Sequence, residues 1–446
     1  MRDLGCVAKV TCSRSAGTLY DFDSQWRQCL GRSVKVIMVT TTGEFHYNCM
    51  YDAELDKKIQ DLKSVIRSWA EKNDLWDEDD CTFKSWSEYF DDEPPENPCV
   101  LVLCASGQLG EILYGCYGYG LYDEFNDLIQ TTEFYFENYG SGAFTFWVAS
   151  DGTLEEAYRN YFEWQWICDL VQPDFSDLYE EVYTRFHKSP DDLYHLDPRK
   201  FEVLLDGIFR NNGYQTQLGS GRSDGGIDLR LYSNDVIGEV VTLVQAKRYA
   251  TSNPIDLQAV QALSAVVEDE RANQGLFVTT SRYLPCAQRF AARQNKRIKL
   301  ANSNDVSRWS SRAAERIIRD KSSLVKHDHL LYLLNSKNPI NTLEGKIFRA
   351  TKYYRMTRNY FAIVLRESKG AVLLMKLPQI TVSTVGNAFR GYEIPDTGVA
   401  ALENLNAENV FRAKKKCNDK GELYLWGDQK LYSFWDNKPQ YYDHLD

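Results

Sequence analysis

Residues 224–228 of the chain read DGGID, and residues 244–249 read VQAKRY. The first run opens one predicted strand and the second closes the next, since both are followed or preceded by β-branched and apolar residues. Side chains alternate between the faces of a strand, so Gln245 and Lys247 are expected on the same side. The Gly-Gly pair is a flexible entry to its strand, and we expect it to bring Asp228 opposite them. A carboxylate, an amide oxygen and an ammonium then meet at one end of a sheet.

The sequence around these runs predicts the order α-β-β-β-α-β-α-β-α. A helix begins at Asp197-Pro198, because Asp is a good N-cap and Pro is tolerated in the first turn, and it ends at Asn211-Asn212-Gly213. The other predicted elements are strands at 227–231, 239–246, 275–279 and 298–300 and helices at 255–268, 284–294 and 304–318. This order favours a mixed sheet flanked by helices.

The residue types suit phosphodiester hydrolysis. The scissile group is negative and gains charge in the transition state, so a divalent cation held by oxygen ligands can neutralise it and acidify the attacking water. A nearby lysine can orient that water and stabilise the charge. Oxygen ligands without a Cys or His cluster favour Mg²⁺ or Mn²⁺ over zinc. The spacing alone also occurs by chance, and Asp224 with its two glycines is equally explained as a turn.

Further runs in the same order strengthen the nuclease interpretation. Residues 201–202 read FE, 213–214 read GY and 275–281 read GLFVTTS, and a predicted helix at 287–290 and strand at 298–300 follow. Together with DGGID and VQAKRY, these runs resemble the Mrr-type restriction endonuclease domain of the PD-(D/E)xK nuclease superfamily. The resemblance covers about residues 193–309, near a quarter of the chain, and implies a restriction-endonuclease-like fold.

The resemblance also implies roles for single residues. Asp228 would be the main metal ligand, and Gln245 would take the second ligand position, where many members of the superfamily have Glu or Asp. The backbone carbonyl of Ala246 would complete the ligands on that strand, and Lys247 would be the catalytic lysine. Glu202 would bind metal-bound water or hold Lys247; the alternative is a solvent-facing helix residue.

Nucleic-acid contacts are harder to assign. The hydroxyls after the 275–279 strand could touch a phosphate or equally cap the next helix. Residues 345–361 interleave basic with aromatic side chains, which fits phosphate binding and base stacking, although we favour a strand or helix with an aromatic core face and a solvated basic face. The candidate nucleic-acid-binding residues are Arg248, Thr280, Ser281, Lys352 and Arg355.

Charge divides the chain into unequal parts. The net charge is −11, but residues 1–190 carry −19, residues 191–320 carry +2 and residues 321–446 carry +6. Residues 271–320 hold 11 basic and 3 acidic side chains. A polyanion is therefore repelled by the first part and attracted to the rest.

The length of 446 residues predicts several domains. We expect an acidic α/β or α+β domain at 1–150, a helical connector at 151–190, the nuclease-like domain at 191–320 and a small, basic, β-rich domain at 325–446. The supporting patterns are strands at 34–40, 99–104 and 144–148, helices at 55–69, at 153–170 and from near Asp174, an exposed loop at 74–96, and hairpins pairing 361–365 with 371–377 and 422–426 with 431–435.

Composition limits where the chain works. No apolar stretch approaches the ~18 to 20 residues that a membrane span needs, and the N-terminus lacks the apolar core of a secretory signal. The 11 cysteines are scattered, with no C-x-x-C pair, so we expect reduced thiols and no zinc site. These features predict an intracellular, cytoplasmic protein.

The sequence thus predicts a metal-dependent endodeoxyribonuclease that acts in restriction or antiviral defence on foreign or modified DNA. Cutting both strands needs two active sites, so a homo-oligomer is expected, and the acidic N-terminal part is expected to bind a protein partner or sense a trigger. Two alternatives stay open. One is a non-catalytic DNA-binding or regulatory protein on a nuclease-like scaffold, and the other is a nuclease for RNA or branched DNA.

Overall fold

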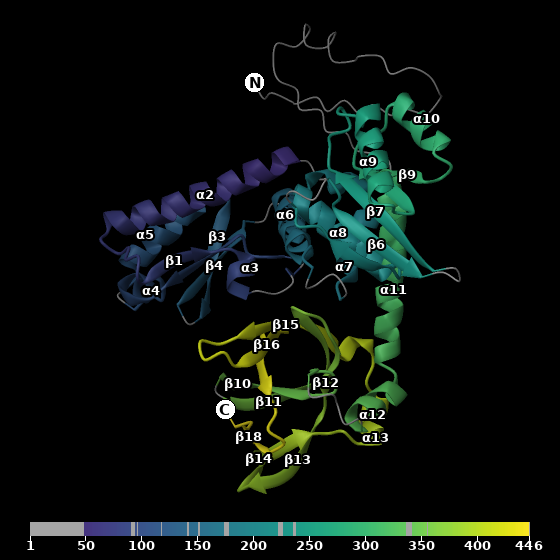
Figure 1. Cartoon of the computed structure of the whole chain (residues 1–446). Coiled ribbons are helices and arrows are strands. Elements are labelled where there is room, and N and C mark those ends of the chain that lie inside the picture. The colour runs from purple at the N-terminus through teal and green to yellow at the C-terminus, as the bar shows by residue number, and fades with distance from the viewer. Residues whose placement is uncertain are drawn as a thin grey trace, which may run out of the picture. The chain divides into compact units, whose positions relative to one another are not determined.

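The computed structural model describes residues 49–445 apart from 91–93, 96, 117, 141, 150–151, 174–177, 222–225, 235–237, 336–340 and 355. Within that part, the strands form three sheets with helices around them (Figure 1). The predicted strand at 34–40 lies outside the described residues, as do Asp224 and Arg355. No helix of the described part is long and apolar enough to cross a membrane.

The first sheet is antiparallel throughout, in the order β1-β2-β4-β3. This arrangement is α+β, one of the two classes left open for this region. Part of the predicted loop at 74–96 is instead ordered, because Trp86 and Phe90 are buried and stack at 4.0 Å between ring centroids. The elements are α2 (Cys49–Lys72), β1 (Cys81–Lys84), α3 (Trp86–Phe90), β2 (Leu101–Ala105), α4 (Gly107–Leu113), α5 (Tyr119–Gln130), β3 (Phe134–Gly140) and β4 (Ala143–Val148).

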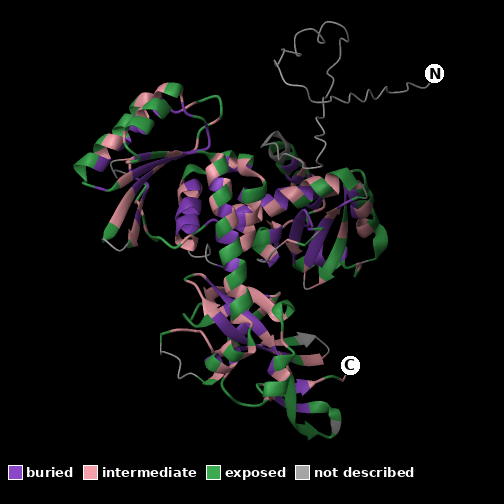
Figure 2. Cartoon of the chain, turned by 90° about the vertical axis from the view of Figure 1, so that its right-hand side faces the viewer, coloured by how far each residue is buried: buried purple, intermediate pink, exposed green. Residues whose placement is uncertain are grey.

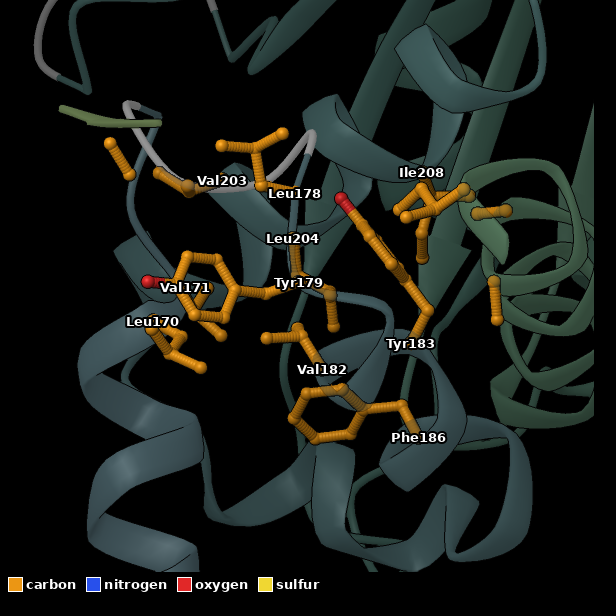
Figure 3. Close-up of a cluster of buried hydrophobic side chains, with 14 of the residues drawn as sticks. Leu170, Val171, Leu178, Tyr179, Val182, Tyr183, Phe186, Val203, Leu204 and Ile208 are labelled. Atoms are coloured by element: carbon orange, nitrogen blue, oxygen red, sulfur yellow. The ribbon is translucent and has the colours of Figure 1, made fainter. Parts of the chain in front are cut away.

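Helices α6 (Gly152–Leu170) and α7 (Glu180–Lys188) and the short η1 (Pro190–His195) precede the middle sheet. The helix predicted to start near Asp174 starts at Glu180. Val182, Tyr183 and Phe186 of α7 enter the same buried cluster as Leu204 and Ile208 of α8 (Pro198–Asn211), as Figure 3 shows. This contact fixes α8 against the helices that precede it.

The middle sheet has five strands in the order β5-β6-β7-β8-β9, and the element order is the one predicted, although the four predicted strand ranges did not include β5. Strands β5, β6 and β7 pair antiparallel, whereas β7, β8 and β9 pair parallel, which confirms the mixed sheet. The elements are β5 (Gln215–Leu218), β6 (Leu229–Asn234), β7 (Glu239–Lys247), α9 (Leu257–Asp269), β8 (Gln274–Thr279), α10 (Pro285–Arg293), β9 (Ile298–Ala301) and α11 (Ser303–Leu324).

Helices cover both faces of this sheet, and the strands are buried between them (Figure 2). Val244 belongs to the cluster that contains the α8 side chains, while Leu243 belongs to the cluster of α9 and α10. Neighbouring residues of β7 therefore point into different cores, as the alternation along a strand requires.

The last sheet has nine strands, in the order β10-β17-β16-β15-β12-β11-β18-β14-β13. An additional β10–β11 pairing joins the strands from β10 to β11 into a closed ring. Both predicted hairpins are confirmed, as β11/β12 and β16/β17. The elements are α12 (His327–Asn335), β10 (Ile347–Tyr354), β11 (Met356–Glu367), β12 (Ala371–Leu377), β13 (Gln379–Val385), β14 (Asn387–Pro395), α13 (Val399–Glu403), η2 (Ala407–Asn409), β15 (Val410–Cys417), β16 (Leu423–Gly427), β17 (Lys430–Phe434) and β18 (Gln440–Asp443).

The cluster around α7 gives a stability prediction. Phe186 is 0 % exposed and lies against Trp164, so Phe186→Ala leaves a cavity in this buried cluster and is expected to lower the free energy of unfolding by about 3–5 kcal/mol. Urea denaturation followed by circular dichroism measures this loss. Phe434→Ala is the control, because its ring is 57 % exposed. Equal losses in the two variants would contradict the packing role of Phe186.

Candidate active site

Asp228 lies immediately before β6 and is 7 % exposed. Its backbone N–H donates to the Val244 carbonyl at 2.9 Å, and its carboxylate Oδ2 accepts from the Ala246 N–H at 2.7 Å. The β6–β7 register pairs Leu229 with Val244, and one further step places Asp228 opposite Gln245. The predicted encounter of Asp228 with the end of β7 is therefore present in the structure.

Gln245 contributes a side-chain oxygen that accepts no hydrogen bond from the described residues. Its side-chain Oε1 is buried and has no hydrogen-bond partner among the described residues. Gly226 has a φ of +83°, and a Cβ there would stand 3.1 Å from Gln245 Nε2, so glycine lets the turn approach the amide. A buried carbonyl oxygen without a donor is costly, which makes Gln245 Oε1 a good position for a cation.

Lys247 ends β7 on the same side as Gln245. It is partly buried, and none of the described carboxylates forms an ion pair with it. Its backbone carbonyl accepts from Thr279 Oγ1 at 2.7 Å and from the Thr280 N–H at 3.3 Å. The backbone of Lys247 is thus held in place while its ammonium is available to a ligand.

Thr280 and Ser281 are buried, and their hydroxyls are used within the fold. Thr280 Oγ1 donates to the Tyr249 carbonyl at 2.7 Å and accepts from the Tyr249 N–H at 2.9 Å, while Ser281 Oγ donates to the Asn253 carbonyl at 2.9 Å. These bonds fix the segment that follows Lys247. The structure therefore gives no support to a phosphate contact by either hydroxyl.

Glu202 lies on α8, which begins as predicted: the Asp197 side chain accepts from the Arg199 N–H at 2.8 Å, and Pro198 occupies the first turn. The Glu202 side chain is 15 % exposed and is therefore partly buried. Its Oε2 accepts from Arg199 Nη1 at 2.5 Å. Sequence reasoning missed Arg199, although its i,i+3 spacing to Glu202 in the first turn was a usable signal.

Two other candidates are engaged or remote. Arg248 Nη1 donates to the Tyr194 carbonyl at 2.6 Å, and its guanidinium lies 5.3 Å from the centre of the Tyr194 ring. Lys352 is exposed on β10 and stands opposite Arg358 on β11, whereas Phe348 and Phe361 of the same stretch are buried. The favoured interpretation of residues 345–361, an aromatic core face with a basic solvated face, agrees with these positions.

The atoms at this site that could bind a metal are all oxygens. They are the carboxylate of Asp228, the amide of Gln245 and the backbone carbonyl of Ala246, and Glu202 is connected to Asp228 through Arg199 and Gly219. No group of three or more His, Cys, Asp or Glu side chains that could hold a metal occurs in the described part of the chain. A cation here would depend on the Gln245 amide and on backbone, and the unpartnered Gln245 Oε1 fits Mg²⁺ or Mn²⁺ in that role.

Comparisons with known proteins find relatives of the middle part of the chain. The Mrr_cat family model, described as a restriction endonuclease, matches residues 193–310, which confirms the predicted resemblance. The type IV methyl-directed restriction enzyme EcoKMrr of Escherichia coli is 32% identical over 106 residues, 23% of this chain and 34% of the relative. The uncharacterized protein y4cE of Sinorhizobium fredii is 33% identical over 105 residues, 23% of this chain and 27% of the relative. The chain thus matches about a third or less of the length of these relatives.

Two solved structures were also found. The DNA modification-dependent restriction endonuclease AspBHI has 16% identity and a TM-score of 0.25, over 42% of this chain and 58% of that one. The MspJI restriction endonuclease in complex with a 27-mer oligonucleotide has 22% identity and a TM-score of 0.23, over 34% of each chain. At these TM-scores we draw nothing from either.

The approach of Gly226 to Gln245 can be tested. Gly226→Ala places a side chain at positive φ and against Gln245 Nε2, so we expect a loss of about 1–2 kcal/mol in stability and weaker Mn²⁺ binding. Gly118→Ala is the matched control, since its φ is +84° and nothing lies within 4 Å of the added Cβ. Urea denaturation and titration calorimetry with Mn²⁺ measure the two effects. If both variants bind Mn²⁺ alike, the turn does not position Gln245.

Proposed function

Because residues 193–310 belong to the restriction endonuclease family, we propose that the chain is a metal-dependent endodeoxyribonuclease. It hydrolyses phosphodiester bonds of DNA and works in restriction or antiviral defence against foreign or modified DNA. The observation that carries the proposal is the meeting of Asp228, Gln245 and Lys247 at the ends of β6 and β7, with Gln245 Oε1 left without a donor.

Asp228, Gln245 Oε1, the Ala246 carbonyl and Glu202 would hold the cation. When bound, Mg²⁺ or Mn²⁺ neutralises charge on the scissile phosphate and acidifies the attacking water. Asp228 is preorganised for this role, since the Ala246 N–H orients its carboxylate. Gln245 adds an oxygen without adding negative charge, so the site is less acidic than one with a second strand carboxylate.

Lys247 has two roles in this mechanism, hydrogen bonding and charge stabilisation. Its ammonium donates hydrogen bonds to the attacking water or to a non-bridging phosphate oxygen, and it stabilises the charge that develops there. Both tasks need a fixed starting point for a flexible side chain. The bonds from Thr279 and Thr280 to the Lys247 carbonyl provide it.

DNA is the favoured substrate on two grounds. Residues 191–320 and 321–446 carry net positive charge, so a nucleic acid is attracted to them and repelled by the acidic first part. EcoKMrr, the relative in Escherichia coli, is described as methyl-directed, and we extend that preference to this chain as part of the proposal. Arg248, Lys352 and Arg355 remain proposed DNA contacts.

Cleavage of both strands requires two active sites, so we propose a homo-oligomer as the active species. The acidic residues 1–190 do not suit a DNA surface. We assign them to a protein partner or to the recognition of a trigger that releases the nuclease. In this scheme the charge of the first part limits cleavage until that trigger is present.

Digestion assays test the proposed function. Purified wild type with Mg²⁺ is expected to cut plasmid DNA, and EDTA is expected to stop the reaction. Asp228→Ala and Lys247→Ala are each expected to slow cleavage by roughly 10²–10³-fold or more, because the first removes a metal ligand and the second removes the ammonium that stabilises the developing charge. The substrate panel should contain methylated and unmethylated plasmid, four-way junctions and RNA, each with and without phage lysate as trigger.

Lys299→Ala is the matched control, since Lys299 is an exposed lysine on β9 of the same sheet. It is expected to cut at the wild-type rate. Undiminished cleavage by Asp228→Ala and Lys247→Ala would refute the site. DNA binding that ignores Mg²⁺, with no cleavage of any substrate in the panel, would favour the non-catalytic alternative.

A further inference from the structure

Arg199 joins two parts of the candidate site that are distant in sequence. Its Nη1 donates to Glu202 Oε2 at 2.5 Å, and its Nη2 donates to the Gly219 carbonyl at 2.7 Å. One guanidinium therefore holds the first turn of α8 to the segment that follows β5. Among the described residues, the bond from Arg199 to Glu202 uses Oε2.

The connection continues to the metal ligands. The Gly219 N–H donates to the Asp228 carbonyl at 2.7 Å, directly at the residue whose carboxylate faces the end of β7. Gly221 has a φ of +76°, and a Cβ there would stand 3.3 Å from Arg199 Nη1. The turn thus lies against the guanidinium. Arg199 links Glu202 to Asp228 through a single intervening residue, Gly219.

A planar fork is needed for this link. Arginine presents several N–H donors in a fixed plane and can bind two acceptors at once, whereas the lysine ammonium acts as a point charge on a flexible stem. Helix α8 offers a comparison: Arg210 pairs with Asp206 at 3.1 Å and also donates to the Pro173 carbonyl at 3.5 Å, at the far end of the same helix. The Arg199 pair differs because its second acceptor is Gly219, which bonds to Asp228.

We propose that Arg199 is a positioning residue that holds Glu202 and the 219–221 turn in the geometry that divalent-metal binding requires. This inference rests on the proposed function, because it concerns the same metal site. Arg199 acts through Glu202 and Asp228 and touches neither the substrate nor the cation.

The sign of the effect separates positioning from simple electrostatics. A nearby cation repels Mn²⁺, so if Arg199 contributed only its charge, Arg199→Ala would tighten Mn²⁺ binding. If Arg199 positions the ligands, Arg199→Ala weakens it. Loss of a residue that orients metal ligands typically costs about 10–100-fold in metal affinity, and we expect a change of that order.

Titration calorimetry with MnCl₂ alone, without DNA, is the experiment. Wild type, Arg199→Ala, Arg199→Lys and Arg210→Ala are compared, with thermal melting recorded for each. We expect Mn²⁺ affinity to fall by about tenfold or more in both Arg199 variants and to stay at the wild-type value in Arg210→Ala. In a Glu202→Gln background, Arg199→Ala is expected to lose less affinity than in the wild type, because the two residues act as a unit.

Each other result overturns the inference in its own way. Wild-type or tighter binding by Arg199→Ala excludes positioning, and full rescue by Arg199→Lys shows that charge suffices without the fork. Equal weakening by Arg210→Ala shows a general effect on α8. No Mn²⁺ binding by the wild type refutes the proposed metal site itself, which distinguishes that failure from failure of the role of Arg199.

Discussion

The hydrogen bond from the Ala246 N–H to Asp228 Oδ2, at 2.7 Å, joins the two strands that carry the candidate site. Here the Asp228 side chain, rather than a backbone carbonyl, accepts the hydrogen bond from the Ala246 N–H. The bond is possible only in the observed β6–β7 register, in which Leu229 stands opposite Val244. A slip of one residue would turn every side chain of a strand to the other face, and Gln245 and Lys247 would no longer face Asp228.

Packing of the middle sheet fixes that register. Val244 and Leu229 enter the core that contains α8, whereas Leu243 enters the core of α9 and α10. Gln245 and Lys247 continue the side of Leu243 beyond the apolar part of the strand. Glu202 comes from the helix on the opposite face, so it can join the site only around the sheet end. Gly219 and Gly221, which follow β5, contact Arg199, and Gly219 bonds to Asp228.

Local patterns explain what the sequence could predict. The alternation at Gln245 and Lys247 and the cap at Asp197 depend on neighbours in the chain, and both agree with the structure. Arg199 escaped notice because its second partner, Gly219, is 20 residues away. The pairing of β10 with β17, which together with the β10–β11 pairing completes the ring, joins segments too distant for any local pattern to show. The many acidic residues at 74–96 predict an exposed loop, although Trp86 and Phe90 are buried. Net charge says little about which side chains pack.

The charges at the candidate site give a reason for glutamine at position 245. The carboxylates of Asp228 and Glu202 are balanced by the side chains of Arg199 and Lys247, so these four groups sum to zero. The site then has no net negative charge to attract a divalent cation. A bound phosphodiester adds one negative charge and so favours binding of the cation. Metal and DNA should therefore each strengthen the binding of the other. A glutamate at 245 would hold the cation more firmly in the absence of DNA, whereas glutamine leaves a weaker DNA-free site that a bound phosphodiester strengthens.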